Sequence, residues 1–193
     1  MRPNKSRNLT TPDLVLLSLL CELPRHGYEA NLELERRDVK DWAGVSRPQV
    51  YYSLEKLSRL GLVGAAKSEE PIAGPERRVL ATTRKGRAAL ADALERADWT
   101  VHRDRPPFLT WMALSWQARP GVFRRQAMRR QKYLEGELAR EQATIKSVRK
   151  EVGETYPEAI WMLNLVIQQF KLELAWLRKV LRESASRPRA RRK

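Results

Sequence analysis

Cysteine and histidine are scarce in this chain of 193 residues, and their scarcity limits the chemistry that the chain can perform. Cys21 is the one cysteine, which excludes a disulfide within the chain, and histidine occurs only as His26 and His102. Metal-ligand spacings, nucleotide-binding glycine loops and nucleophile motifs are also missing from the sequence. We therefore expect no catalytic residue, no metal site and no cofactor. The lone thiol in an apolar run indicates a reducing compartment.

Long apolar runs are missing as well. The run from Leu14 to Cys21 is much shorter than the roughly 20 residues that a helix needs to cross a bilayer. Basic residues precede it, as in a secretory signal, but Asp13 interrupts the boundary and Pro24 follows without a small-residue cleavage site. We expect this segment to be the buried first helix of a cytoplasmic protein that has no membrane partner.

Acidic residues are few relative to basic ones. Lysine and arginine number 38 against 23 aspartates and glutamates, which gives a net charge of +15 and a pI near 10.5. Since 42% of the residues are hydrophobic, the chain can bury a core, and its excess charge indicates a polyanionic partner, either nucleic acid or an anionic membrane surface. The alternative explanation of the excess charge is that the arginines only keep the protein soluble. The final RPRARRK holds five positive charges, and we expect residues 187–193 to be a disordered basic tail.

The order of the expected elements in the N-terminal half is typical of a winged helix-turn-helix. Thr11 and Pro12 mark a helix start, Pro24 ends that helix, and Thr83 caps a later one. The expected elements are helices at 14–23, 26–37 and 47–60, extended segments at 62–67 and 77–82, and a helix from 83 towards 99. The sequence thus predicts a mainly α fold with a small β-wing, in which a winged helix-turn-helix domain at 1–96 precedes a helical domain at 97–186.

One of these helices, within GVSRPQVYYSLEKLSRLGLV (44–63), has an unusual outward face. Val50, Leu54 and Leu57 fall on one side at helical spacing, so this side should be buried. The opposite side carries glutamine, tyrosine, lysine and arginine. That combination differs from the usual solubilising mixture and favours a surface that binds DNA.

The start of the same helix is expected to contact DNA bases. Two caps fit the sequence: Ser46, with Gln49 reaching back to it, or Arg47, with Pro48 in the first turn. Arginine pairs with guanine, and glutamine with adenine, through two hydrogen bonds in the major groove, whereas other basic and tyrosine side chains suit phosphate. An ordinary solvated helix face is the alternative. The expected DNA-binding residues are Ser46, Arg47, Gln49, Tyr51, Tyr52, Lys56, Arg59, Arg77 and Arg78.

Three blocks of sequence, taken in order, resemble the PadR family of bacterial transcriptional regulators: HGYEANLELERR, SRPQVYYSLEKLSRLGLV and GPERRVLATTRKGRAAL. The likeness covers residues 12–90, and the long helical remainder resembles the larger subtype of the family. It implies an N-terminal winged helix-turn-helix followed by a helical dimerisation domain. Two positions depart from the family pattern, because Asn31 replaces an apolar residue and Val79-Leu80 replaces an aromatic one.

The resemblance also implies a homodimeric repressor that binds an inverted-repeat operator in double-stranded DNA and is released by a small aromatic effector. Two other functions stay open: a non-specific nucleic-acid-binding or structural protein, and a helical adaptor that binds other proteins. Tryptophans in the C-terminal half would suit a planar apolar ligand, although such residues also fill cores. The expected ligand-binding residues are Trp99, Trp111, Trp116 and Trp161.

Two long helices are predicted at about 121–152 and 157–183, and the second has a strict heptad pattern. Its apolar seam is wide, because Trp161 and Trp176 lie beside it. We expect the seam to form a dimer interface in preference to the alternative, a hairpin of two helices within one chain. The seam residues are Ile160, Leu163, Ile167, Phe170, Leu174, Leu177 and Leu181.

Overall fold

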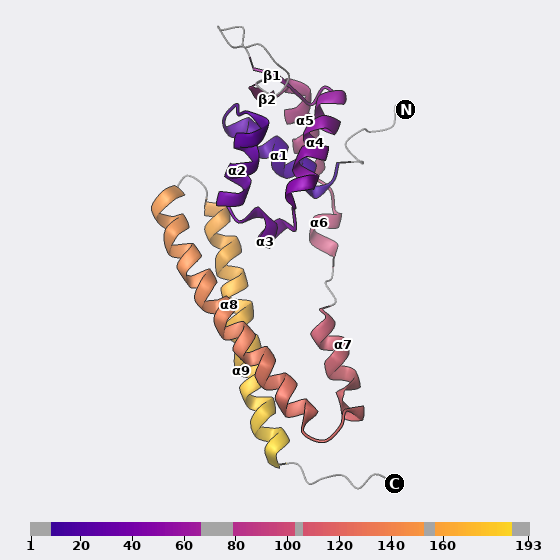
Figure 1. Ribbon diagram of the computed structural model, residues 1–193, viewed down its shortest axis with the longest axis vertical. Helices are drawn as coiled ribbons and strands as arrows, with labels where there is room; N and C mark the ends of the chain where they lie inside the picture. The colour runs from indigo at the N-terminus through magenta and orange to yellow at the C-terminus, as the bar shows by residue number, and fades with distance from the viewer. Residues whose placement is uncertain (1–8, 67–78, 103–105, 153–156, 187–193) are drawn as a thin grey trace. The chain divides into compact units, whose positions relative to one another are not determined.

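A computed structural model of the protein describes residues 9–66, 79–102, 106–152 and 157–186. The chain divides into two compact units, Met1–Arg103 and Asp104–Lys193, which follow one another along the colour gradient of Figure 1. Arg77, Arg78 and the tail at 187–193, all singled out in the sequence, lie outside the described residues.

The first unit contains six helices and a two-stranded sheet among its described residues. These elements are α1 (Thr11–Glu22), α2 (Gly27–Arg36), α3 (Val39–Ala43), α4 (Arg47–Arg59), β1 (Val63–Ala65), β2 (Leu80–Thr82), α5 (Arg84–Leu94) and α6 (Asp98–Val101). The mainly α fold with a small β-wing is therefore confirmed.

Helix α1 forms the centre of this unit. It is apolar on most sides, and its side chains Leu16, Leu17, Leu19 and Leu20 are at most 2% exposed. It packs against α4, α5 and β2, so that the buried side chains of these elements contact α1. This arrangement explains why a short helix of the sequence can be hydrophobic almost all round without crossing a membrane.

Helix α3 occupies a segment for which the sequence analysis expected only a turn. Asp38 adopts a left-handed conformation (φ 50°) that ends α2, and Gly44 adopts another (φ 66°) that ends α3. Between them Val39 is buried in the core. The helix predicted to bind DNA is consequently the fourth helix of the chain, α4, and not the third.

The wing is an antiparallel pair of strands, in which Val63 lies opposite Thr82. Leu80 also pairs with Arg25 through two backbone hydrogen bonds of 3.0 and 2.8 Å, which ties the wing to the segment between α1 and α2. At the start of α5, a Cβ atom on Gly86 would lie 2.1 Å from the Leu62 carbonyl oxygen. Only glycine permits α5 to approach the wing this closely.

The second unit is a long helical hairpin with a short helical segment before it (Figure 1). Aromatic rings hold that segment in place, because Trp111 stacks between Phe108 and Phe123 at centroid distances of 5.5 and 5.8 Å. The elements are α7 (Pro107–Leu114), the 3-10 helix η3 (Ser115–Gln117), α8 (Val122–Val152) and α9 (Pro157–Ser186).

The heptad seam of α9, which the sequence led us to expect at a dimer interface, packs in the structure against α8 of the same chain. Leu163, Ile167, Leu174 and Leu177 are buried there, in two clusters that also contain Ala127, Leu134 and Ile145 of α8. The other seam residues, Ile160, Phe170 and Leu181, are half-buried and pack on the same clusters. The apolar contact that the heptad pattern predicts is present, and its partner in the structure is α8 of the same chain.

Candidate nucleic-acid interface

The start of α4 presents side chains that are free of the core. Ser46 is the N-cap residue, and its backbone N–H and hydroxyl each donate a hydrogen bond of 2.8 Å to Gln49 Oε1. Of the two caps that the sequence allowed, the structure therefore adopts Ser46, with Arg47 and Pro48 as the first two helical residues. Arg47, Pro48 and Gln49 are all exposed.

The cap changes what Gln49 can do. Pairing with adenine through two bonds requires the amide oxygen as acceptor and the amide nitrogen as donor. Both donors of Ser46 occupy that oxygen, so only the Gln49 amide nitrogen is available without opening the cap. In this conformation Gln49 is a donor, and it suits an acceptor in the major groove such as guanine O6, thymine O4 or a purine N7.

Arg47 is held by a neighbouring tyrosine. A hydrogen bond to Tyr51, one turn further along α4, raises the pKa of the fully exposed Arg47 guanidinium, and Glu35 and Tyr28 of α2 contribute charge at longer range. Tyr51 and Tyr28 are themselves largely exposed. The guanidinium is thereby oriented at the open end of α4 while its other N–H groups still face solvent.

The middle of the outward face carries Tyr52, Glu55 and Arg59, which are all exposed. Their spacing of three and four residues places them in one row along α4. Glu55 was not among the residues singled out from the sequence, although the same helical spacing would have found it. A carboxylate in this row can accept a hydrogen bond from cytosine N4 and would repel phosphate, so the row is better suited to bases than to backbone.

Lys56 does not lie on this outward face. Its Nζ is 2.5 Å from Asp13 Oδ2 in α1, and its side chain is only 17% exposed. The same carboxylate oxygen accepts hydrogen bonds from the Thr10 backbone N–H at 2.8 Å and the Thr10 hydroxyl at 2.9 Å. The expected phosphate contact is therefore replaced by a buried ion pair that joins α4 to the start of α1.

Two further polar groups are buried next to this surface. Burial raises the pKa of Asp13, but hydrogen bonds from Lys56, Thr10 and Ser53 outweigh it and hold that pKa below its ordinary value. Asn31, which departs from the family pattern, is a buried amide whose Nδ2 donates to Glu35 Oε1 at 2.8 Å. Asp13 was not singled out from the sequence, because nothing local to it indicates a partner 43 residues away.

The four tryptophans expected to bind a ligand are not brought together. Trp99 belongs to the first unit, where it lies under Arg96 and donates from Nε1 to the Ala93 carbonyl at 2.7 Å. In the second unit Trp111 is part of the ring cluster that secures α7. Trp116 and Trp161 are 78% and 64% exposed, and neither makes a ring contact among the described residues.

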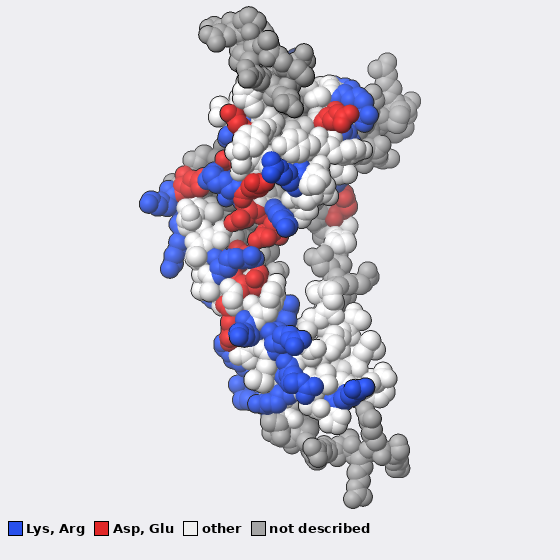
Figure 2. Space-filling model, in the orientation of Figure 1, with Lys and Arg blue, Asp and Glu red and all other residues white. Residues whose placement is uncertain are grey.

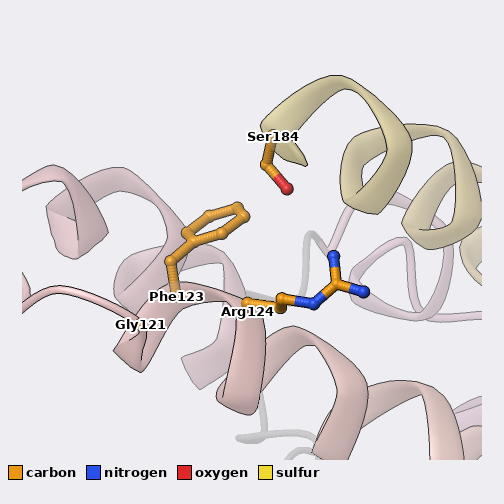
Figure 3. A pocket seen from close by; sticks show the side chains of 4 residues that line it. All are labelled: Gly121, Phe123, Arg124 and Ser184. Carbon is orange, nitrogen blue, oxygen red and sulfur yellow. The ribbon is translucent and has the colours of Figure 1, made fainter. Parts of the chain in front are cut away.

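A small pocket of about 230 Å³ lies at the start of α8. Gly121, Phe123 and Arg124 line it from the α8 side, and Ser184 lines it from the end of α9 (Figure 3). It thus offers one aromatic ring and one guanidinium to a small ligand. Within the described ranges no cluster of three or more His, Cys, Asp or Glu side chains could hold a metal ion, and no helix is long and apolar enough to span a membrane.

Comparison with known proteins supports this description of the fold. Residues 16–92 match the model of the Transcriptional regulator PadR-like family. The structure of Bacillus subtilis PadR in complex with operator DNA is similar to this chain, with a TM-score of 0.72 and 16% identity over 89% of this chain and 97% of that one. The Vibrio cholerae virulence activator AphA gives a TM-score of 0.69 and 22% identity over 92% and 99% of the two chains. No curated protein sequence matches the chain.

Proposed function

We propose, from the match of residues 16–92 to the PadR-like family model, that the protein is a sequence-specific DNA-binding regulator that reads the major groove with α4. The observation that carries the proposal is the open face of α4, where Arg47, Gln49 and Tyr52 are exposed although the opposite side of the helix is buried. A helix of 13 residues with such a face fits the major groove, and its N-terminal side chains meet base edges. The similar Bacillus subtilis PadR was crystallised with operator DNA.

The regulator acts as a homodimer in this proposal. The support is an apolar stripe on α9, on the side opposite the seam that packs against α8, since its residues follow helical spacing about half a turn from the seam. Leu165 and Leu172 are 61% and 73% exposed, and large apolar side chains gathered on one exposed side of a helix favour an interface. We define the α9 stripe as Trp161, Leu165, Leu172 and Trp176. The two tryptophans lie on this side and not beside the seam, where the sequence led us to expect them, and Trp176 also makes an edge contact with Phe108 of α7.

Two joined subunits would place two copies of α4 on successive turns of an inverted repeat. The regulator is a repressor in this proposal, and a small aromatic effector would weaken operator binding by changing the separation of the two copies of α4. The pocket beside Phe123 and Arg124 supports an aromatic acid as the effector, because a ring can stack on Phe123 while a carboxylate pairs with the guanidinium. A second structure of Bacillus subtilis PadR is a complex with p-coumaric acid.

The central claim is tested by selecting bound fragments from random duplex DNA, followed by footprinting of the selected sequence. We expect a protected inverted repeat, and we expect Arg47→Ala and Gln49→Ala each to weaken binding to it by about 5- to 150-fold, the range for a lost base contact. Arg87→Ala is the matched control, since Arg87 is an exposed arginine that belongs to α5 and not to α4. An absence of any preferred sequence would show that the chain binds DNA non-specifically, and equal effects of Arg47→Ala and Arg87→Ala would remove α4 from recognition.

A further inference from the structure

The beginning of α8 concentrates positive charge. Its first 13 residues, 122–134, contain five basic side chains and no acidic one. Figure 2 shows Lys and Arg side chains gathered, on the face in view, over the end of the hairpin where α8 begins and α9 ends. The five residues are Arg124, Arg125, Arg129, Arg130 and Lys132.

One of the five is neutralised within the protein. Arg130 makes two hydrogen bonds to Glu173 of α9, at 2.8 and 2.9 Å, and lies over the rings of Phe108 and Tyr133. Arg125, Arg129 and Lys132 are exposed, and none of them makes an ion pair with any residue that the structure describes. Their charge is therefore available to an external anion.

The position of these charges within the helix opposes the usual preference. The N-terminal end of a helix carries a partial positive charge, which favours acidic side chains in the first turn. Helices α1, α2 and α9 follow this rule with Asp13, Glu29 and Glu158, whereas α8, like α4, α5 and α7, has no acidic residue in its first turn. The first turn of α8 carries Arg124 and Arg125 instead. The helix dipole and the side chains thus add to a single positive field at this end of the hairpin.

Arg125, Arg129 and Lys132 form a row along the outward side of α8, at intervals of four and three residues. The row spans about 10.5 Å of helix axis at ~1.5 Å per residue. A DNA duplex carries about six phosphate charges over that length, at one charge per ~1.7 Å. The side of α8 opposite the row is already occupied, because Ala127 and Leu134 are fully buried against α9.

We propose that this α8 row is a second DNA-binding surface, which contacts the phosphate backbone of duplex DNA independently of α4. Guanidinium groups suit phosphate oxygens because they present several N–H donors in one plane. An anionic membrane fits the row less well, since a helix that lies on a membrane inserts the apolar side opposite its cations, and in α8 that side is packed against α9. The row supplies affinity without sequence preference, whereas α4 supplies the preference.

The test measures the affinity of the full-length protein for a duplex of random sequence at several salt concentrations. Neutralising the row in Arg125→Gln/Arg129→Gln/Lys132→Gln should reduce the slope of log K against log salt by about 2 to 3, because each released phosphate contact contributes roughly 0.9. The matched control, Lys146→Gln/Arg149→Gln/Lys150→Gln, removes three exposed charges from the other end of α8 and should leave the slope within about 1 of the original, the size of a single contact. Circular dichroism verifies that both variants keep their helices, and Arg125→Lys/Arg129→Lys, which retains the charge, should keep the full slope.

Equal loss of slope in the row variant and its control would overturn the proposal, because it would show an effect of total charge alone. An unchanged slope in the row variant would also overturn it. Binding to vesicles containing phosphatidylserine is measured in parallel, and a row variant that loses vesicle binding but keeps its DNA binding would assign the row to a membrane instead. The result is separable from the proposed role of α4. Arg47→Ala/Gln49→Ala should abolish sequence preference and leave the contribution of the α8 row in place.

Discussion

Lys56 illustrates how a single side chain is assigned to the wrong face of a helix. On a helical wheel it lies near the border between the buried and the outward sides of α4, and a lysine stem is long enough to reach either way. The deciding feature is Asp13, which is fully buried and needs a cation. That partner belongs to α1, so no pattern within α4 could have revealed it.

We predict that Lys56→Ala destabilises the fold by about 3 kcal/mol, because it leaves the buried Asp13 carboxylate without its partner. Urea unfolding followed by circular dichroism measures the change. Lys40→Ala, at an exposed lysine of α3, should change the unfolding free energy by less than about 0.5 kcal/mol. If Lys56→Ala instead keeps full stability and reduces only DNA affinity, Lys56 contacts phosphate as the sequence first indicated.

Glu33 gives a second prediction, for the dependence of stability on pH. Hydrogen bonds from Arg36 and from Arg37 lower the pKa of Glu33 from 4.5 to about 2. The bonds from Arg36 have the largest effect, and burial opposes them. A carboxyl whose pKa is depressed by folding stabilises the protein above its unfolded pKa, and this contribution is lost as the pH falls. We expect Glu33→Gln to unfold at a temperature that depends less on pH between about 4.5 and 2 than that of the original protein.

The control for that measurement is Glu95→Gln, since Glu95 is exposed and makes no ion pair among the described residues. It should retain the pH dependence of the unmodified chain. If the melting temperatures of the Glu33→Gln variant and of the unmodified protein change equally with pH across this range, the ion pairs of Glu33 with Arg36 and Arg37 do not stabilise the fold.

At the scale of elements, local sequence signals were sufficient for most helix boundaries. Pro12 in the first turn of α1 and Thr83 before α5 mark helix starts that the structure confirms, although the N-cap of α1 is Thr10 and not Thr11. Helix α3 was missed because its five residues are too few to show a helical period, and it depends on the left-handed Asp38 and Gly44 and on the burial of Val39. These are tertiary features that a periodicity argument does not detect.

The heptad seam of α9 was recognised correctly as an apolar contact, but a heptad pattern does not state whether the partner helix belongs to the same chain. The structure pairs it with α8. We therefore predict that Ile167→Asp/Leu174→Asp unfolds the hairpin rather than separating subunits, because it places two charges in a buried apolar seam. Circular dichroism should show a loss of helix and a lower melting temperature.

Gln168→Asp is the matched control for this seam variant, since Gln168 is exposed on the same helix and belongs neither to the seam nor to the α9 stripe. It should preserve the helical content and the melting temperature of the hairpin. A seam variant that stays fully helical but becomes monomeric would mean that the seam joins two chains after all.

At the scale of the whole molecule, charge is divided unevenly. The first unit holds 18 basic and 14 acidic residues, a net charge of +4, whereas the second holds 20 and 9, a net charge of +11. The amino-acid sequence contains this asymmetry, but it does not distinguish a solvated helix face from a binding surface for the arginines of α8. Only the packing of α8 on α9 reveals that three of the cations form an exposed row that makes no ion pair with any described residue. The α9 stripe was hidden for a similar reason, because α9 is apolar on two sides and the seam dominated its pattern.

Assembly of the whole molecule depends on the α9 stripe if our proposed dimer is correct. Leu165→Glu/Leu172→Glu places two like charges on an exposed apolar surface that is remote from the core seam, so the hairpin should remain folded while the dimer dissociates. Sedimentation at micromolar concentration should then show a monomer. Binding to the selected inverted repeat should weaken by at least about 100-fold, because two linked contacts become two separate ones, and affinity for an isolated half-site should be unchanged.

Leu109→Glu, at an exposed leucine of α7 outside the stripe, should leave the dimer intact. A stripe variant that still sediments as a dimer would place the interface elsewhere on the chain, whereas an unmodified protein that is monomeric yet protects both half-sites would show that the operator itself brings the two copies together.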